Sequence, residues 1–253
     1  EETMVLARHL ADDAAMATAY VDLGSALVHL GEYELARDHG ERAYALVDDA
    51  SMTAISARVL LAGACTYLGQ VAHARSMVEE ARACASKIGM PYFIAFWSAY
   101  GASSLLLLRD LERTRSAAEE ALQLAAESGF SIVHMKAAML LGGCDVQEGR
   151  VEEGRAAVVD GYAAFLASGE LTSTTAWQTI VVEAHLACGD VASAKQVLDA
   201  AFAFVEETGE RILEHELHRL RGECLLADPA LPGGRAHAAE QFERAVAIAA
   251  ERG

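Results

Sequence analysis

The most site-like set of residues in this 253-residue sequence lies at positions 214–218, which read Glu-His-Glu-Leu-His. The two histidines are three residues apart on a predicted helix, so they could share an edge that faces Cys224. Imidazole, carboxylate and thiolate groups in such an arrangement could hold a transition metal. Two ligands on one helix also arise by accident, and a solvated helix face of mixed charge is the favoured interpretation. An enzyme or metal protein built on the Glu214 to Cys224 cluster is therefore kept only as an alternative.

Pairs of adjacent acidic residues are a second candidate for catalysis. Neighbouring residues of a helix point about 100° apart, so such pairs form no carboxylate dyad, and a solvated outer face explains them better. The pairs are Glu79-Glu80, Glu119-Glu120, Glu152-Glu153 and Glu206-Glu207. The sequence also contains no nucleophile elbow, zinc-protease motif, Walker phosphate loop or dinucleotide fingerprint. It therefore predicts a protein that is not an enzyme and carries no cofactor or metal.

The composition indicates a packed helical protein. Hydrophobic residues make up 53% of the chain and there are only three prolines, which favours α-helix throughout. The formal net charge of −17 argues against binding nucleic acid or an anionic membrane surface through bulk charge. No segment has the length and apolar character of a membrane span or the sections of a signal peptide, so we expect a soluble, cytoplasmic protein.

The cysteines are predicted to be reduced core residues rather than disulfide partners. They are odd in number, widely scattered and surrounded by small or apolar residues, and a chain of this length buries an adequate core without covalent links. The five are Cys65, Cys84, Cys144, Cys188 and Cys224.

A repeat of about forty residues organises the chain. Its equivalent positions, called markers below, are Gly31, Gly69, Arg109, Gly149, Gly189 and Gly233, with steps of 38, 40, 40, 40 and 44 residues. Twenty residues after the markers stand Ser51, Gly89, Gly129, Gly169, Gly209 and Gly253. Because glycine readily closes a helix in the left-handed conformation, this position predicts the end of a helix in each repeat.

Each repeat is predicted to be a helical hairpin. Small residues recur five and twelve positions after the markers, two helical turns apart, so they share a face that lets a partner helix approach closely. They are Ala36, Ala74, Thr114, Gly154, Ala194 and Ala238, then Ala43, Ala81, Ala121, Gly161, Ala201 and Ala245. The first helices are predicted at about 14–30, 52–68, 91–108, 131–148, 171–188 and 210–227. One hairpin cannot cover its own apolar faces, so hairpins must stack on one another.

This pattern resembles the tetratricopeptide repeat (TPR) family. Leu23-Gly24, Gly31, Ala36 and Ala43 match the family's Leu-Gly pair, inter-helix turn and two small residues in spacing, and residues 141–161 repeat the match loosely. The resemblance implies an all-α, right-handed superhelical solenoid of about six antiparallel hairpins. Long-period, proline-free repeats of this kind resemble the helical region of ATPase-containing bacterial transcription activators related to MalT, and of adenylate cyclases that carry an ATPase module.

In stacked hairpins of this family the first helices line a concave groove. Inward positions counted back from the markers predict a groove with an apolar middle and polar edges, where Glu216 and Glu223 also lie. The candidate binding residues are Asp22, His29, Tyr67, Phe96, Tyr100, Ser103, Lys136, Met139, Gln147, Glu183 and Arg219.

Aromatic residues are concentrated on one of these helices. Phe93, Phe96, Trp97 and Tyr100 lie together, next to the lone cation Lys136, in a chain that is only 6% aromatic. Such a patch could anchor a peptide helix or a small ligand, although filling the space between neighbouring repeats is the favoured interpretation. We expect Trp97 to be packed, and Tyr100 and Lys136 to be exposed.

The whole chain is predicted to be one solenoid domain. Residues 1–11 have the pattern of the end of a preceding helix, and the units are 12–51, 52–89, 90–129, 130–169, 170–209 and 210–253. The segment Asp228 to Gly234 is predicted to be a loop. The ends carry no polar capping helix, so we expect a piece of a larger protein, with self-association through uncapped ends as one option.

These observations favour a non-catalytic module for protein interaction and signal sensing in a larger bacterial regulator. Its partner would be a protein or peptide in the groove, other domains of the same polypeptide or a small-molecule effector. The alternative is a free-standing adaptor or chaperone scaffold that binds a peptide segment.

Overall fold

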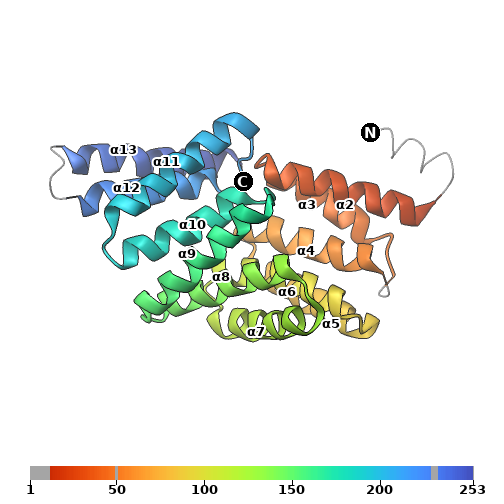
Figure 1. The fold of residues 1–253 in the computed structure, drawn as a ribbon. Coiled ribbons are helices and arrows are strands. Elements are labelled where there is room, and N and C mark those ends of the chain that lie inside the picture. The colour runs from red at the N-terminus through yellow and green to blue at the C-terminus, as the bar shows by residue number, and fades with distance from the viewer. Residues whose placement is uncertain (1–11, 49–50, 229–232, 253) are drawn as a thin grey trace. The chain divides into compact units, whose positions relative to one another are not determined.

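The computed structural model describes residues 12–48, 51–228 and 233–252 (Figure 1). Over these residues every regular element is an α-helix, which confirms the predicted all-α class. The first helices of the hairpins are α2 (Asp13–His29), α4 (Met52–Tyr67), α6 (Pro91–Leu107), α8 (Ser131–Gln147), α10 (Thr174–Ala187) and α12 (Glu214–Ala227). The second helices are α3 (Tyr33–Tyr44), α5 (Val71–Ile88), α7 (Leu111–Ser128), α9 (Val151–Ser168), α11 (Val191–Thr208) and α13 (Gly234–Glu251).

The turn inside each hairpin falls at the predicted marker. All six markers have a positive φ, and they include Arg109, with φ 58°, although that conformation favours glycine. The register of the repeat, rather than the residue type, therefore fixes this turn. After the second helices α5, α7, α9 and α11, a glycine in the left-handed conformation ends the helix as predicted.

The first repeat departs from this rule. Helix α3 ends at Tyr44, so the prediction that it continues to Ser51 is wrong. Ser51 has an extended backbone and begins the next helix instead, where its hydroxyl accepts a hydrogen bond from the amide of Ala54 at 3.1 Å. A serine side chain suits this N-cap role better than a left-handed helix end. Residues 1–11, 229–232 and Gly253, which carry parts of the predictions on the chain ends and the loop, lie outside the described residues.

The small residues of the second helices form the predicted buried faces. Those five and twelve positions after the markers are all buried. Helices α8 and α9 approach closely, since a β-carbon added at Gly154 would lie 2.6 Å from the carbonyl oxygen of Gly142. These two helices can pack this closely because both positions lack a side chain.

The chain divides into two compact units, which are described separately. Unit 1 comprises Glu1–Val28 and Glu32–Ala137, and unit 2 comprises Ala138–Gly253 with His29–Gly31. In unit 1, Ala95 of α6 and Ala121 of α7 share an apolar cluster with Val133 of α8, the first helix of the next hairpin. In unit 2, Leu198 of α11 packs against Leu217 and Leu220 of α12. Successive hairpins thus cover one another's apolar faces within each unit, as the repeat predicted.

The cysteines are free thiols, as predicted, and four of the five are buried. Burial raises the pKa of Cys65 and of Cys224 to about 11. These thiols therefore remain protonated at neutral pH and act as small core residues. Among the described helices, none has the length and apolar character needed to cross a membrane.

Candidate functional site

The aromatic stripe of α6 is one part of the predicted groove that the structure leaves accessible. Phe96, Tyr100 and Ser103 are half-buried and Leu107 is exposed, at spacings that place all four on one helix face. The rings of Phe96 and Tyr100 lie with their centroids 4.8 Å apart. An apolar face with a tilted pair of aromatic rings in contact on a rigid helix suits the binding of an apolar side chain.

Trp97 lies on the other side of α6 and is packed, as predicted. Its side chain is buried, and its indole Nε1 donates a hydrogen bond to the carbonyl oxygen of Val78 at 2.9 Å. Trp97 therefore fills space between hairpins, and the aromatic residues of this helix divide into a core residue and an accessible pair.

The prediction that Lys136 is exposed is wrong. Its side chain is fully buried, its Nζ donates a hydrogen bond to the hydroxyl of Tyr100 at 2.7 Å, and Nζ lies 4.2 Å from the centre of that ring. A buried ammonium needs such partners because it has lost its water. Lys136 therefore ties α8 to α6, and a ligand in the groove could not reach it as a free cation.

Met139 is also fully buried, so its predicted contact with a groove ligand does not fit the structure. Lys136 and Met139 lie at positions of α8 that were predicted to face the groove, but in the structure other side chains pack over both of them. Gln147, at the end of the same helix, is half-buried.

The other candidates in the first helices of the early repeats have separate surroundings. Asp22 is exposed, and His29 is half-buried at the end of α2. The ring of Tyr67 stacks on that of Tyr33 with centroids 4.9 Å apart. Ser103 donates its hydroxyl to the carbonyl oxygen of Tyr100 at 2.7 Å, which satisfies the hydroxyl within α6.

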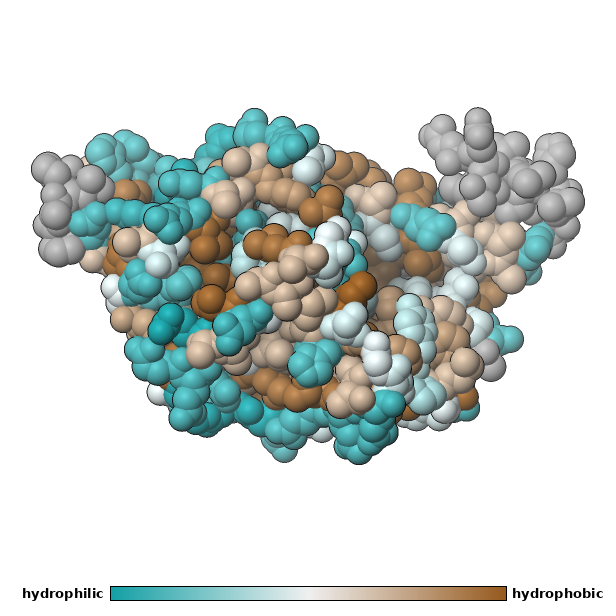
Figure 2. Space-filling view, in the orientation of Figure 1, coloured by the Kyte–Doolittle hydropathy of each residue, from teal (hydrophilic) through white to brown (hydrophobic). Residues whose placement is uncertain are grey.

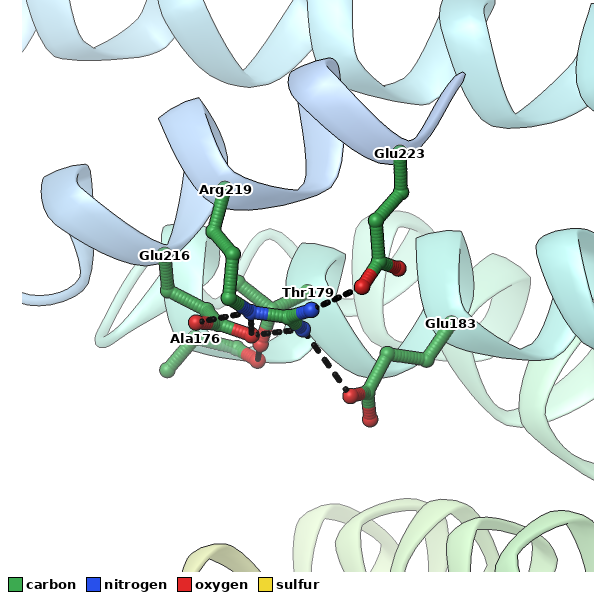
Figure 3. A network of polar contacts seen from close by, with 6 residues as sticks. All are labelled: Ala176, Thr179, Glu183, Glu216, Arg219 and Glu223. Carbon is green, nitrogen blue, oxygen red and sulfur yellow. Dashed lines mark hydrogen bonds and ion pairs between the residues drawn. The ribbon is translucent and has the colours of Figure 1, made fainter. Parts of the chain in front are cut away.

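In unit 2, the structure brings together the polar residues predicted on α10 and α12 (Figure 3). The Nε of Arg219 donates to Glu216 at 2.7 and 2.9 Å, and the guanidinium also contacts Glu223 and, at 3.4 Å, Glu183 of α10. Hydrogen bonds to Glu216 raise the pKa of Arg219 above its ordinary value and outweigh its partial burial. Three carboxylates around one guanidinium leave a net charge of −2 on this partly exposed surface.

The cluster from Glu214 to Cys224 is not assembled as a metal site. His218 Nδ1 lies 2.8 Å from Oε1 of Gln241, and Cys224 belongs to the apolar core of unit 2. Glu214 binds Arg252. Across the described part of the chain, no group of three His, Cys, Asp or Glu residues is placed to hold a metal ion.

Glu214 gives unit 2 a measurable dependence on pH. Burial raises the pKa of this carboxyl. The hydrogen bond from Arg252 at 2.5 Å and the charges of Arg252 and Arg211 together lower the pKa by more than burial raises it, so the net shift is downward from 4.5. A folded-state pKa below the unfolded one stabilises the fold at neutral pH, and this contribution is lost as pH falls through the folded pKa.

We therefore expect Glu214→Gln to cost about 1–3 kcal/mol at neutral pH, since it removes a charged partner of Arg252. The difference from wild type should be constant above about pH 5.5 and shrink below about pH 4.5. Urea unfolding at a series of pH values measures it, with Glu240→Gln, an exposed carboxylate of α13, as the control. A difference that does not change with pH would contradict the assigned pair.

Comparison with known proteins supports the fold. No family model and no curated protein matches the chain by sequence. Among solved structures, a Rap protein complexed with Competence and Sporulation Factor superposes with a TM-score of 0.65 at 15% identity, over 94% of this chain and 77% of that one. Aspartyl phosphate phosphatase F from Bacillus subtilis gives a TM-score of 0.62 at 14% identity, over 95% of this chain. PilF of Pseudomonas aeruginosa gives 0.50 at 14% identity, over 92% of this chain and 91% of that one.

The likeness extends over nearly the whole chain, which spans 60% of the length of the Bacillus phosphatase. At these identities the superpositions show a shared fold. Together with the hairpins, the marker turns and the buried small residues, they show that this chain has a tetratricopeptide-like helical-repeat fold.

Proposed function

We propose that this protein is a non-catalytic scaffold that binds a peptide or protein segment through the partly exposed faces of its first helices. The observation that carries the proposal is the stripe of Phe96, Tyr100 and Leu107 on α6, in which large apolar side chains remain accessible on a rigid helix. Helical-repeat surfaces of this kind suit extended partners, because each repeat contributes a few side chains at fixed spacing.

The two units offer a ligand different chemistry. In unit 1 the stripe is aromatic and aliphatic, while in unit 2 the surface around Arg219 carries an excess of carboxylates. We expect apolar side chains of a partner on the first surface. Partners of unit 2 would need to tolerate or complement negative charge.

One structural neighbour supports a binding role. The Rap protein was solved in complex with Competence and Sporulation Factor, so a protein of this fold holds a signalling factor. The sequences share only 15% of their residues, so the identity of that factor is not carried over to this chain.

The binding proposal is tested with a peptide selected from a random-sequence library, whose affinity is measured by calorimetry. Phe96→Ala and Leu107→Ala remove surface from the stripe and leave the contact between Lys136 and Tyr100 in place, so both should melt near the wild-type temperature. We expect the two together to weaken binding by at least about tenfold, because hot-spot aromatics often contribute more than 1.4 kcal/mol.

The matched control is Leu166→Ala, which removes an exposed leucine from the second helix α9 and should leave the affinity unchanged. If the stripe variants melt normally and bind the selected peptide as tightly as wild type, the stripe is not the binding surface.

We further propose that the scaffold is the signal-sensing repeat region of a larger bacterial regulator, of the kind that carries an ATPase or cyclase module. The support is the long repeat period and the scarcity of prolines, three in 253 residues, as in the family that the sequence resembles. Sequencing the complete coding region tests this context. An attached ATPase, cyclase or DNA-binding segment is expected, and a coding region without one would favour a free-standing adaptor.

A further inference from the structure

Unit 1 exposes a group of apolar side chains at two consecutive turns between hairpins, α5 to α6 and α7 to α8. Met90, Tyr92 and Ile132 are 53%, 48% and 40% exposed, and Phe93 and Phe130 are half-buried beside them. The ring centroid of Tyr92 lies 5.8 Å from that of Phe130 and 6.1 Å from that of Phe93. These five residues are called the turn patch below; ring contacts join Tyr92, Phe93 and Phe130 across the two turns, and Met90 and Ile132 are their exposed neighbours in the sequence.

The repeat shows that the fold does not require apolar residues at these turns. Met90 and Phe130 occupy the position that Glu170 and Glu210 hold in the next two repeats. Both glutamates accept hydrogen bonds in unit 2, Glu170 within its own turn and Glu210 from the start of α10. Glu170 accepts the amide of Thr172 at 2.9 Å, and Glu210 accepts the amide and hydroxyl of Thr175, near the start of α10, at 2.8 and 2.7 Å.

At the same positions unit 1 thus has exposed or half-buried hydrophobic side chains in place of a capping carboxylate. Single exposed hydrophobic residues are common, but several that touch one another on turns indicate an interaction surface. Figure 2 shows hydrophilic and hydrophobic side chains interspersed on the visible face.

The charges beside the turn patch indicate what covers it. Lys87, near the end of α5, and Glu127, near the end of α7, are exposed, occupy equivalent positions forty residues apart and have opposite charges. In a dimer whose two-fold axis passes between these two repeats, the repeat that holds Lys87 in one copy faces the repeat that holds Glu127 in the other. The axis therefore places Lys87 of one copy opposite Glu127 of the other, at each end of a shared apolar centre.

We propose that the turn patch is a two-fold interface between two copies of this chain. Its apolar centre is formed by Tyr92 and Phe130 with Met90 and Ile132, and its ends by the reciprocal Lys87 and Glu127 contacts. The patch is small, so a reversible dimer in the micromolar range is expected rather than a permanent one. This dimer does not depend on the proposed ligand surface, which lies on another set of α6 residues.

The test measures the mass of the purified chain by sedimentation equilibrium between about 1 and 100 µM, a range that brackets a micromolar dissociation constant. Wild type should pass from monomer to dimer over this range. Tyr92→Glu places a charge in the apolar centre and should raise the dissociation constant by at least about tenfold. Circular dichroism of each variant should remain that of wild type.

Charge exchange makes the test specific for a second copy of the same chain. Lys87→Glu and Glu127→Lys should each weaken the dimer, since each brings like charges together, while the double variant should recover most of the wild-type affinity. Leu166→Glu is the matched control, because Leu166 is 53% exposed outside the patch, and it should leave the dimer unchanged.

A wild-type chain that stays monomeric at 100 µM, a concentration well above a micromolar dissociation constant, would overturn the proposal, and a partner of another kind would then have to cover the patch. A dimer that is unchanged in Tyr92→Glu, or a double charge exchange no stronger than the single variants, would overturn it as well.

Discussion

Gly154→Ala is expected to destabilise unit 2 by about 3 kcal/mol, although the same change in an ordinary helix interior stabilises by up to about 1 kcal/mol. The added β-carbon would lie 2.6 Å from the carbonyl oxygen of Gly142 and 2.7 Å from the amide nitrogen of Val146. Both are backbone atoms of α8, so the clash cannot be relieved by rotating a side chain. It can be relieved only if α8 and α9 move apart, which removes their packing contacts.

Urea unfolding measures this effect, with Gly63→Ala as the control. Gly63 also lies inside a helix, but the nearest neighbour of an added β-carbon is an atom of the Tyr67 ring at 3.9 Å, which is ordinary contact. We expect Gly63→Ala to be neutral or slightly stabilising. A Gly154→Ala protein as stable as wild type would show that the two helices do not approach this closely.

Lys136→Ala is expected to cost about 3 kcal/mol or more, because it removes the fully buried side chain beyond the β-carbon and leaves a cavity beside Tyr100. Lys136→Met keeps most of the volume and removes the charge, so its cost should be smaller. Tyr100→Phe removes the hydroxyl that accepts from Nζ, and it should cost about 1–3 kcal/mol because a buried ammonium loses an acceptor.

Unfolding free energies of the single variants and of Lys136→Met with Tyr100→Phe test this contact directly. In the double variant neither polar partner remains, so it should be more stable than the sum of the single effects predicts. Purely additive effects would contradict a direct interaction. A Lys136→Ala protein that melts like wild type would mean that Lys136 is exposed in solution.

The repeat could be predicted from the sequence because its positions are set by backbone geometry. A residue with positive φ recurs at each hairpin turn, and small residues recur wherever two helices approach closely. Even Arg109, which is not glycine, was placed correctly because five other markers fixed its position. Ser51 was misplaced because one serine can serve either end of a helix, and only the structure shows that its hydroxyl caps α4.

The side-chain surroundings were harder to predict. Counting at about 100° per residue gives the direction of Lys136 but not what packs against that face of α8, so its burial was missed. The same count places Glu183 and Arg219 among the inward positions of their helices, and in the structure the two side chains lie 3.4 Å apart. The turn patch does have a signal in the sequence, namely the change from Met90 and Phe130 to glutamate in the later repeats.

Hydrogen exchange of the chain with and without its library-selected peptide tests most directly whether the first helices form the binding surface. Binding at the aromatic stripe predicts slower exchange in α6, and engagement of unit 2 predicts slower exchange in α10 and α12, with little change in the second helices α5, α7 and α11. Protection confined to the second helices, with α6 unchanged at saturating peptide, would contradict a scaffold that binds through its first helices.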